Sequence, residues 1–276
     1  MADKLRVDLT GAPQTMLATL YGRALDADLP HPVLHDTYAR DVVARIDYDW
    51  SRTSMTAKNS PGVTLRSAHF DNWARQFLAV HPEAVVLHLG CGLDSRYHRL
   101  DPGPAVDWYD VDYPEVIDLR RQLYPTRERC HPIAASVTDP AWLADIPRDR
   151  PVLLLAEGLT MYLSEADGQA LLRRVAANFH CGEMQFDAFS RLGVRLQWTN
   201  AIVRRSGAKL QWAMDKPADV LAAVPGLRLL AWQSAFDSQG FDRLPVSLRL
   251  ASAVLRALPG ARYMSQYHRY SFGIPD

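Results

Sequence analysis

The stretch that most constrains the fold of this chain is VVLHLGCGLDSRYHRL, from Val85 to Leu100. An apolar run that ends directly in Gly-x-Gly is typical of a buried strand followed by a tight turn, where bare backbone N–H groups can approach a ligand closely. Asp112 stands at the end of the next strand-like run, AVDWYDVDYP. An acid at that place binds ribose hydroxyls in α/β nucleotide folds. The pattern predicts an α/β sheet that binds a nucleoside cofactor through Gly90, Gly92 and Asp112, with Asp110 as the alternative acid.

Strands and helices alternate from Ala84 onward, which is the pattern of a mostly parallel sheet built from βαβ units. Seven strands are expected, near 84–90, 105–111, 129–135, 151–156, 183–189, 227–235 and 264–272. Two helices are expected between them, Pro114–Leu123 and Ser164–Phe179, and Ser164 is placed to cap the second. A helical insert of about 191–222 precedes the last two strands.

The first eighty residues contain three apolar stripes with the three- and four-residue steps of amphipathic helices, over 15–25, 38–46 and 65–77. We therefore expect two parts, a helical cap over residues 1–80 and a cofactor-binding core over residues 81–276. The cap and the insert are expected to cover the cofactor and to form the pocket for its reaction partner.

The glycine turn also indicates which nucleoside cofactor is bound. It reads Gly-Cys-Gly-Leu-Asp-Ser, so the third glycine of a G-x-G-x-x-G/A fingerprint is absent. In dinucleotide-binding folds that glycine permits close packing of helix on strand beside the pyrophosphate. S-adenosylmethionine (SAM) has no pyrophosphate, so the turn favours SAM over NAD. The expected architecture is the Rossmann-like, seven-stranded sheet of class I methyltransferases.

Composition limits the partners and the location of the protein. Lys plus Arg and Asp plus Glu both number 31, which argues against a global attraction to nucleic acid. The longest apolar run, Val152–Ala156, is too short to cross a bilayer, and the amino terminus lacks the apolar segment of a secretory signal. The cysteines Cys91, Cys130 and Cys181 show no metal-ligand spacing. A cytoplasmic protein without metal, nucleic-acid or membrane partner is expected.

A family resemblance rests on four ordered segments: VVLHLGCGLDSRYHRL, WYDVDYPEVIDLRR, IAASVTDPAWL and LLLAEGLTMYLSEAD. Together they resemble the leucine carboxyl methyltransferase family, and more closely its bacterial branch, the tetracenomycin polyketide-synthesis-type O-methyltransferases. The resemblance extends more weakly to TMLATLYGRALDAD and to the segment around Arg66, and it thins out past Arg191. It implies the transfer of a methyl group from SAM to an oxygen, often a carboxylate oxygen.

The resemblance implies that four residues hold the methionine end of SAM: Arg23, Arg66, Gly90 and Glu157. Gly90 would let this end approach the backbone, and Glu157 would lie beneath it. Arg66 would pair with the cofactor carboxylate, for which the planar fork of arginine is well suited, and Arg23 would add a second basic contact. The alternatives are a solvated arginine at position 66 and a structural salt bridge at Glu157.

The resemblance assigns the nucleoside end of SAM to Asp112, for the ribose, and to Ser136 and Val137, for the adenine. Eukaryotic members often carry an aspartate where this chain has Ser136, although a serine hydroxyl can accept from the adenine amino group and Asp139 lies nearby in sequence. The alternative for Asp112 is a capping role at the helix that begins at Pro114.

Tyr162 and His69 are the candidate catalytic residues, each with a structural alternative. Tyr162 either directs its hydroxyl toward the substrate or is a core aromatic with a polar tip. His69 lies on an apolar stripe, where a packed histidine is the alternative to a base. Trp198 and Trp212, in the insert, either line a substrate pocket or pack between helices.

Methyl transfer from a sulfonium is an in-line displacement to which the protein contributes mainly proximity and desolvation. A carboxylate acceptor is ionised near neutral pH, whereas a phenol with a pKa near ten benefits from a base. The sequence shows no unambiguous base, which favours methyl-ester formation on a small molecule such as a polyketide-type intermediate of secondary metabolism, with S-adenosylhomocysteine (SAH) as the second product. The alternatives are a phenolic O-methyltransferase, an NAD-dependent oxidoreductase and a non-catalytic SAM-binding scaffold.

Overall fold

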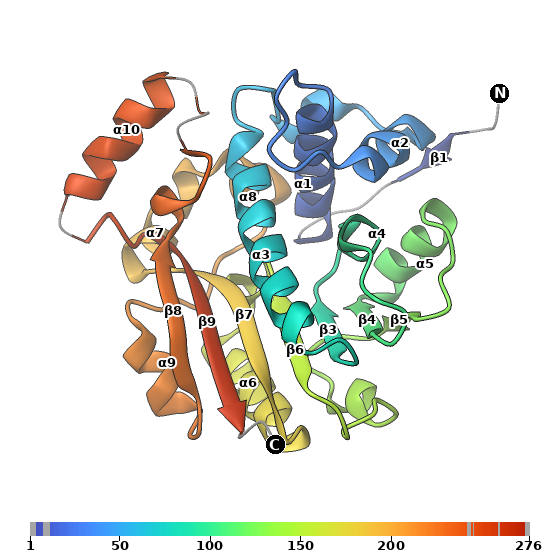
Figure 1. Cartoon of the computed structure of the whole chain (residues 1–276). Coiled ribbons are helices and arrows are strands. Elements are labelled where there is room, and N and C mark those ends of the chain that lie inside the picture. Colours follow the sequence, from blue (N-terminus) through green and yellow to red (C-terminus); the bar gives the residue numbers. More distant parts are fainter. Residues whose placement is uncertain (1–3, 8–11, 242–243, 245, 259, 274–276) are drawn as a thin grey trace.

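A seven-stranded sheet forms the centre of the computed structural model, which describes residues 4–7, 12–241, 244, 246–258 and 260–273 (Figure 1). Its order is β5-β4-β3-β6-β7-β9-β8. The strands are β3 (Val85–Leu89), β4 (Asp107–Asp112), β5 (Cys130–Ala134), β6 (Val152–Ala156), β7 (Cys181–Phe189), β8 (Arg228–Ser234) and β9 (Ser265–Gly273). β9 is antiparallel to both of its neighbours, and the remaining pairs are parallel. The predicted mostly parallel α/β sheet and its strand positions are confirmed.

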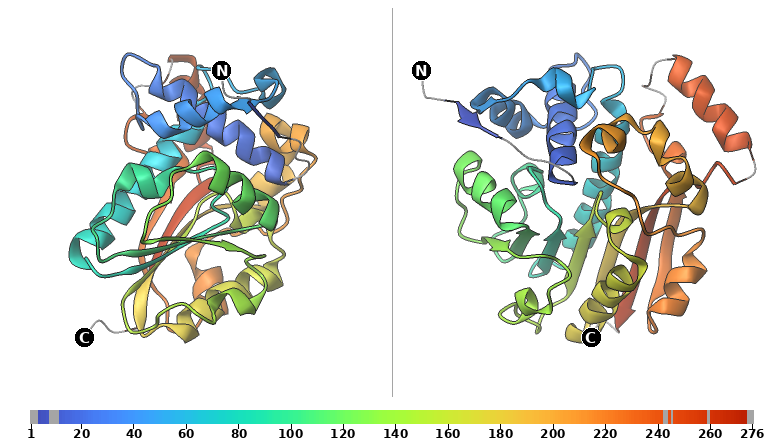
Figure 2. Two further views of the ribbon diagram at one scale, coloured as in Figure 1. Left: turned by 90° about the vertical axis from the view of Figure 1, so that its right-hand side faces the viewer. Right: turned by 180° about the vertical axis from the view of Figure 1, so that it is seen from behind.

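Helices cover both faces of the sheet because the side chains of its central strands are apolar on both sides. On one face, Leu87 and Leu154 pack in a core with α6 (Glu165–Asn178) and α9 (Pro217–Ala223). On the other face, Val86 and Leu155 pack against α3 (Pro61–Val80) and α4 (Arg96–Leu100). Figure 2 shows α3 and α6 on opposite sides of the sheet. The result is a three-layer sandwich.

Two expected helices of the core form as the sequence predicts. α5 spans Pro114–Leu123, and α6 begins after Ser164, whose hydroxyl accepts from the backbone N–H of Asp167 at 3.1 Å. A further helix, α10 (Val246–Ala257), follows β8 and precedes β9 in the sequence, where the sequence analysis expected no helix.

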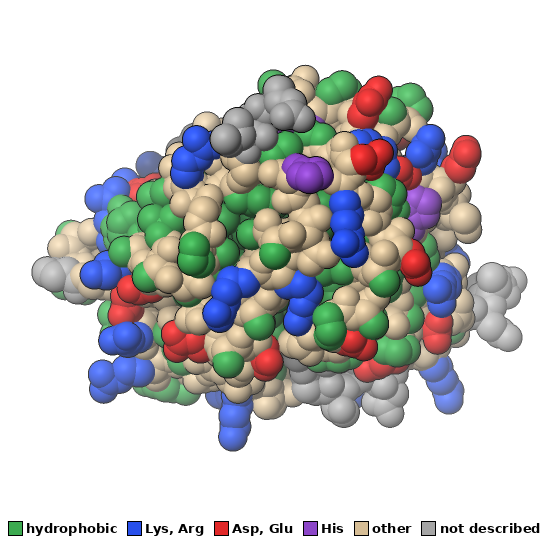
Figure 3. Space-filling view, turned by 90° about the horizontal axis from the view of Figure 1, so that it is seen from below, with side chains coloured by type: hydrophobic (Ala, Val, Ile, Leu, Met, Phe, Trp, Pro, Cys, Tyr) green, Lys and Arg blue, Asp and Glu red, His purple; other side chains and the backbone are tan. Residues whose placement is uncertain are grey.

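None of the described helices is long and apolar enough to span a membrane. Basic and acidic side chains are interspersed on the face opposite the amino-terminal helices (Figure 3).

The amino-terminal helices lie over the carboxyl ends of the parallel strands (Figure 1). α1 (Ala12–Ala27) and α2 (Thr37–Arg45) share an apolar cluster with α5. Two short strands of this region, β1 (Leu5–Arg6) and β2 (Ile46–Asp47), pair with each other in parallel. The division into a cap over 1–80 and a core over 81–276 stays a prediction. α3 belongs to the expected cap, yet its Ala74 and Phe77 pack on the sheet of the expected core.

The insert contributes α7 (Arg191–Arg195), α8 (Ala201–Ser206) and α9. Trp212, only 4% exposed, belongs to the main core. It lies directly over Gly168 of α6, where an added Cβ would be 2.0 Å from the indole. Trp198 is 64% exposed. Neither tryptophan is among the residues that line the cavity described below, and Trp212 has the alternative role in packing.

Candidate active site

A cavity of about 530 Å³ lies where the loops after β3, β4, β5 and β6 meet the amino-terminal helices and α8. Its volume is within the range of about 300–1,000 Å³ that is usual for small-molecule sites. β3 and β6 are neighbours whose connections leave in opposite directions, and ligands of open α/β sheets bind at such a point. Nine of the sequence-predicted site residues line this cavity: Arg23, Arg66, Gly90, Gly92, Asp112, Ser136, Val137, Glu157 and Tyr162.

The turn after β3 requires glycine at two positions. Gly90 and Gly92 have φ angles of 60° and 50°, in the left-handed region that other residues rarely adopt. A Cβ on Gly90 would lie 3.0 Å from Leu159 Cδ1. The backbone N–H of Gly90 donates to Val111 O at 2.9 Å, and that of Gly92 donates to Asp112 Oδ2 at 2.7 Å. The turn is therefore fixed against β4, with bare backbone on the cavity side.

Asp112 is placed to accept further hydrogen bonds from a ligand. Its Oδ1 accepts from the N–H of Tyr113 at 2.8 Å, so each oxygen has one backbone donor and a remaining lone pair. Burial raises the pKa of Asp112, against the lowering effect of those two donors. The residue does not cap α5, whose N-cap is Tyr113.

Asp110, the alternative acid, is occupied within the protein. It accepts from Arg120, from Trp108 Nε1 at 3.0 Å and from His88 Nδ1 at 2.8 Å. Burial would raise its pKa, but Arg120 and His88 outweigh this and lower it. Because Asp110 does not line the cavity, the geometry favours Asp112 as the ribose acceptor.

Arg66 and Glu157 form an ion pair on the cavity wall. Arg66 Nε donates to Glu157 Oε1 at 2.9 Å, and its Nη1 donates to Asp187 Oδ2 at 2.9 Å. Glu157 also accepts from Ser67 Oγ at 3.0 Å and from Arg96. Burial would raise the pKa of Glu157, but the guanidinium groups of Arg96 and Arg66 lower it to about 2. Glu157 is therefore ionised. It forms structural salt bridges, which were the alternative role for this residue, and it also lines the cavity.

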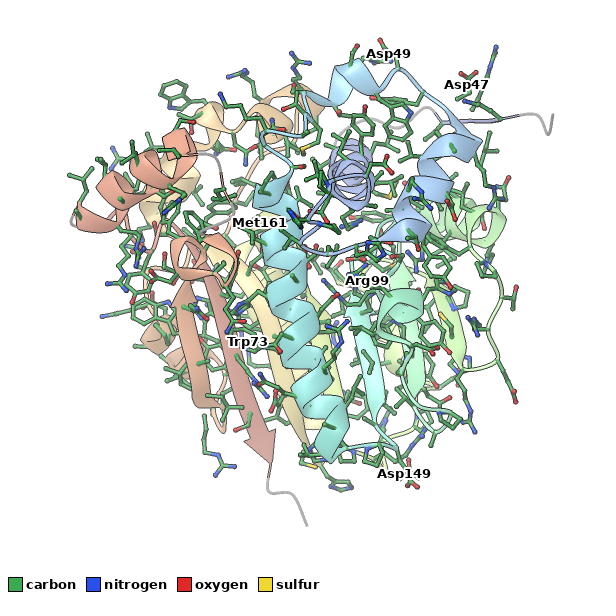
Figure 4. The ribbon with its side chains drawn as sticks, turned by 45° about the horizontal axis from the view of Figure 1, so that its top comes forward. Asp47, Asp49, Trp73, Arg99, Asp149 and Met161 are labelled. Atoms are coloured by element: carbon green, nitrogen blue, oxygen red, sulfur yellow. The ribbon has the colours of Figure 1, made fainter. Side chains whose placement is uncertain are left out.

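A second layer of buried charges lies behind this pair and connects the cap to the glycine turn. Arg99 donates to Asp71 at 2.6 Å, to Asp36 at 3.0 Å and to Asp94 at 2.9 Å, and Figure 4 shows it between the amino-terminal helices and the sheet. Arg96 donates to Asp71 at 2.8 Å and to Glu157. The sequence analysis missed Asp36, Asp71 and Asp187, which come from separate segments and carry no local motif.

Arg23 is the least satisfied of these arginines. It is 3% exposed, yet its one hydrogen bond to a described residue runs from Nη2 to Leu93 O at 3.3 Å. Its contacts with Asp36 and Asp94 are long, at 3.8 and 3.7 Å, and its buried Nε has no hydrogen-bond partner among the described residues. A buried unpaired donor is costly, so Arg23 fits a site that receives an anionic ligand group.

Ser136 and Val137 line the cavity in the loop after β5, beside Ala135. The Ser136 hydroxyl bonds to Thr138 Oγ1 at 2.8 Å. Asp139 does not line the cavity and instead caps the short helix η2 (Pro140–Leu143), accepting from Ala141 N at 2.9 Å. Ser136, rather than Asp139, is therefore the polar side chain of this pair that is placed to contact an adenine in the cavity. Tyr113, half exposed beside Asp112, lines the cavity as well and was missed.

The two catalytic candidates lie in different surroundings. Tyr162 lines the cavity, where its side chain hydrogen-bonds to Thr15 and burial raises its pKa. His69 is not a lining residue; its ring packs 4.2 Å from that of Trp73 and 4.7 Å from that of Tyr267 (Figure 4 labels Trp73). Burial lowers the pKa of His69 to about 4, so it is neutral at physiological pH. Tyr267, which lines the cavity and packs against His69, was missed by the sequence analysis.

Comparison with known proteins agrees with this geometry. The model of the family described as leucine carboxyl methyltransferase matches residues 16–176. The tetracenomycin polyketide synthesis O-methyltransferase TcmP of Streptomyces glaucescens is 45% identical over 267 residues, covering 96% of this chain and 98% of its own. The SAM-dependent methyltransferase dpfgK of Gibberella zeae is 40% identical over 247 residues, covering 82% and 83%.

Solved structures show the same fold at low identity. A protein of Thermobifida fusca aligns with a TM-score of 0.60 and 15% identity, over 92% of this chain and 94% of its own. The plantazolicin methyltransferase BamL, solved with SAH, aligns with a TM-score of 0.51 and 11% identity, over 95% and 97%.

Proposed function

Because the chain belongs to the leucine carboxyl methyltransferase family, whose members transfer methyl groups from SAM, we propose that it methylates a carboxylate of a small, polyketide-type molecule. The products are a methyl ester and SAH. The relative from Streptomyces glaucescens, named for polyketide synthesis, supports the class of acceptor, because its similarity covers nearly all of both chains.

The lining residues fit SAM at both of its ends. Asp112 holds the ribose hydroxyls, Gly90 and Gly92 expose backbone beside the methionine part, and Ser136 with Val137 borders the adenine. Arg66 and Arg23, both of which line the cavity, receive the cofactor carboxylate. Glu157 orients Arg66 through their 2.9 Å contact and faces the cationic end of the cofactor.

The charge balance of the network behind the cavity suits a cationic cofactor. Four arginines (Arg23, Arg66, Arg96 and Arg99) face five carboxylates (Asp36, Asp71, Asp94, Glu157 and Asp187), which leaves one negative charge in the described cluster. SAM carries two cationic groups, the sulfonium and the ammonium, and one carboxylate. An excess negative charge in a buried setting therefore favours the binding of SAM as a whole.

The state of the lining acids and bases is the observation that carries the carboxylate assignment. Glu157 is ionised and bonded to Arg66, Ser67 and Arg96. His88 is bonded to Asp110, and burial raises the pKa of Tyr267 and of Tyr162. Glu157, Tyr162 and Tyr267 are therefore unsuited to remove a proton near neutral pH. An acceptor that is already ionised needs no such step, and an aromatic or aliphatic carboxylic acid is ionised.

The bound cofactor supplies an activated methyl group on a positively charged sulfur. The chain holds the acceptor oxygen in line with that methyl group, and the cap and α8 exclude water from the cavity. Transfer forms the O–CH3 bond and breaks the S–CH3 bond, so the carboxylate and sulfonium charges disappear together. Tyr162, neutral and bonded to Thr15, contributes by positioning. His69 does not line the cavity, so a catalytic role of His69 would act through Tyr267, which packs against its ring and lines the cavity.

The test uses a panel of matched acids and phenols, such as naphthalene-2-carboxylic acid and 2-naphthol, with SAM labelled in its methyl group. Mild alkali releases volatile labelled methanol from a methyl ester and leaves an aryl ether intact. We expect labelled, alkali-labile product from the acids. Alkali-stable product from the phenols alone would establish the phenolic alternative, and SAH binding without turnover of any member would favour the scaffold.

A further inference from the structure

The cavity has a second region beyond the cofactor-binding residues. Its walls come from the cap (Met55 and Val63), from Met161 and from α8 (Ile202 and Val203), and they are apolar. Ile202 packs with the cluster of Ala18, Met55 and Val63, while Val203 packs with Met161 and Leu210. α8 therefore forms a wall between the cap and the loop after β6 (Figure 4 labels Met161).

α8 is held in this place by polar contacts on two sides. Arg205 Nη1 donates to the carbonyls of Ser51 and Arg52 in the cap, at 3.4 and 3.3 Å. The backbone N–H of Gln211 donates to Met161 O at 2.7 Å. The carboxyl end of α8 and the segment that follows it are therefore fixed to the cap and to the loop after β6.

Asn200 is the N-cap of α8, and this role fixes the orientation of its amide. Its Oδ1 accepts from the N–H of Ile202 at 3.0 Å and from that of Val203 at 3.3 Å. Only the carbonyl side of the amide can accept from two N–H groups, so Nδ2 must lie on the other side. Asn200 lines the cavity, and its Nδ2 donates to no described residue. By contrast, both ends of the Asn59 amide are engaged, with Thr56 and Ser54.

A neutral donor is well matched to a carboxylate that must be methylated. Only one of the two carboxylate oxygens attacks, and a hydrogen bond to the other oxygen fixes the direction of the first. The negative charge of the acceptor disappears during transfer. A full positive charge would hold the starting carboxylate more tightly than the transition state, whereas an amide N–H orients it at a smaller cost to the rate.

We propose that Asn200 is an acceptor-binding residue, whose Nδ2 donates to the non-attacking carboxylate oxygen while the apolar walls formed by Met55, Val63, Met161, Ile202 and Val203 contact a hydrocarbon body. This inference rests on the proposed function and adds its substrate class: an acid with a largely apolar body.

The variant Asn200→Asp separates binding from capping. Aspartate caps a helix as well as asparagine does, but it lacks Nδ2 and repels a carboxylate. Asn200→Ser likewise keeps a capping oxygen without the amide donor. With the acid of the panel that turns over fastest, we expect the acceptor Kd, measured by calorimetry on SAH-saturated protein, to rise about ten- to hundredfold in both variants. The KM for the acceptor should rise similarly, with the Kd for SAH and the Tm unchanged.

Asn72→Asp, at an exposed position of α3 outside the cavity, is the matched control and should leave all four values unchanged. If Asn200 only caps α8, the Asp and Ser variants will bind the acceptor as the wild type does, and the proposal is overturned. Wild-type protein that binds SAH yet methylates no acid would refute the proposed function instead, so the two failures are distinguishable.

Discussion

Removal of the Asp112 carboxylate tests the ribose assignment most directly. The structure leaves one lone pair on each oxygen, because Gly92 N–H occupies one at 2.7 Å and Tyr113 N–H another at 2.8 Å. Hydrogen bonds to a charged group contribute about 1.5–3 kcal/mol each. In Asp112→Ala, water replaces the carboxylate as the partner of the ribose hydroxyls, so we take the contribution of about one such bond as the net loss. The Kd for SAH should then rise about ten- to hundredfold.

Calorimetric titration of the variant with SAH measures this loss. Asp118→Ala is the matched control, since Asp118 lies on the adjacent α5 with a 66% exposed side chain and loses the same charge. Asp112→Asn keeps the size of the side chain and should weaken SAH binding to a smaller extent. A folded Asp112→Ala protein that binds SAH with the wild-type Kd would refute the assignment.

Three further predictions follow from the buried charges and from His69. Arg96→Ala leaves Asp71 and Glu157 without their common partner and should lower the free energy of unfolding by about 3–5 kcal/mol in urea, against about 0.5 kcal/mol or less for the exposed Arg121→Ala. Glu157 has a pKa of about 2 in the folded chain and 4.5 ordinarily, so its stabilisation is complete above pH 4.5 and is lost as the pH falls toward 2. The urea midpoint of Glu157→Gln should therefore change less over that interval; an equal change would contradict the ion pair. His69→Phe should retain kcat, because His69 is neutral and does not line the cavity, and a tenfold fall in kcat with unchanged SAH affinity would establish a catalytic role.

The sequence predicted those parts of the structure that have local signals. β3 and β6 are buried, short apolar runs that end at a turn, and all seven strands lie within two residues of their expected positions. Gly90, Gly92 and Asp112 follow from their places at strand ends. α10 carries a helical signal as well, with Val246, Leu250 and Val254 at four-residue steps, but it was overlooked.

The charged network behind the cavity has no local signal. Arg66 meets Glu157 across 91 residues of sequence and Asp187 across 121, and only the packing of α3 on the sheet brings them together. The same holds for Asp36 and Arg99, which are 63 residues apart. His69 shows the opposite failure, because a polar residue on an apolar stripe gives no information about the cavity until the rings of Trp73 and Tyr267 are placed around it.

The contact between Trp212 and Gly168 sets a rule for chimeras of this enzyme. The acceptor-side wall at residues 200–203 and the buried indole belong to one insert, but the indole occupies a space that exists only because α6 has no side chain at 168. A segment transplanted from a relative must bring an equally large residue to position 212 or leave a hole in the main core that costs about 3–5 kcal/mol. A chimera designed to change which acceptors are methylated should therefore exchange only residues 191–210 and keep both Trp212 and Gly168.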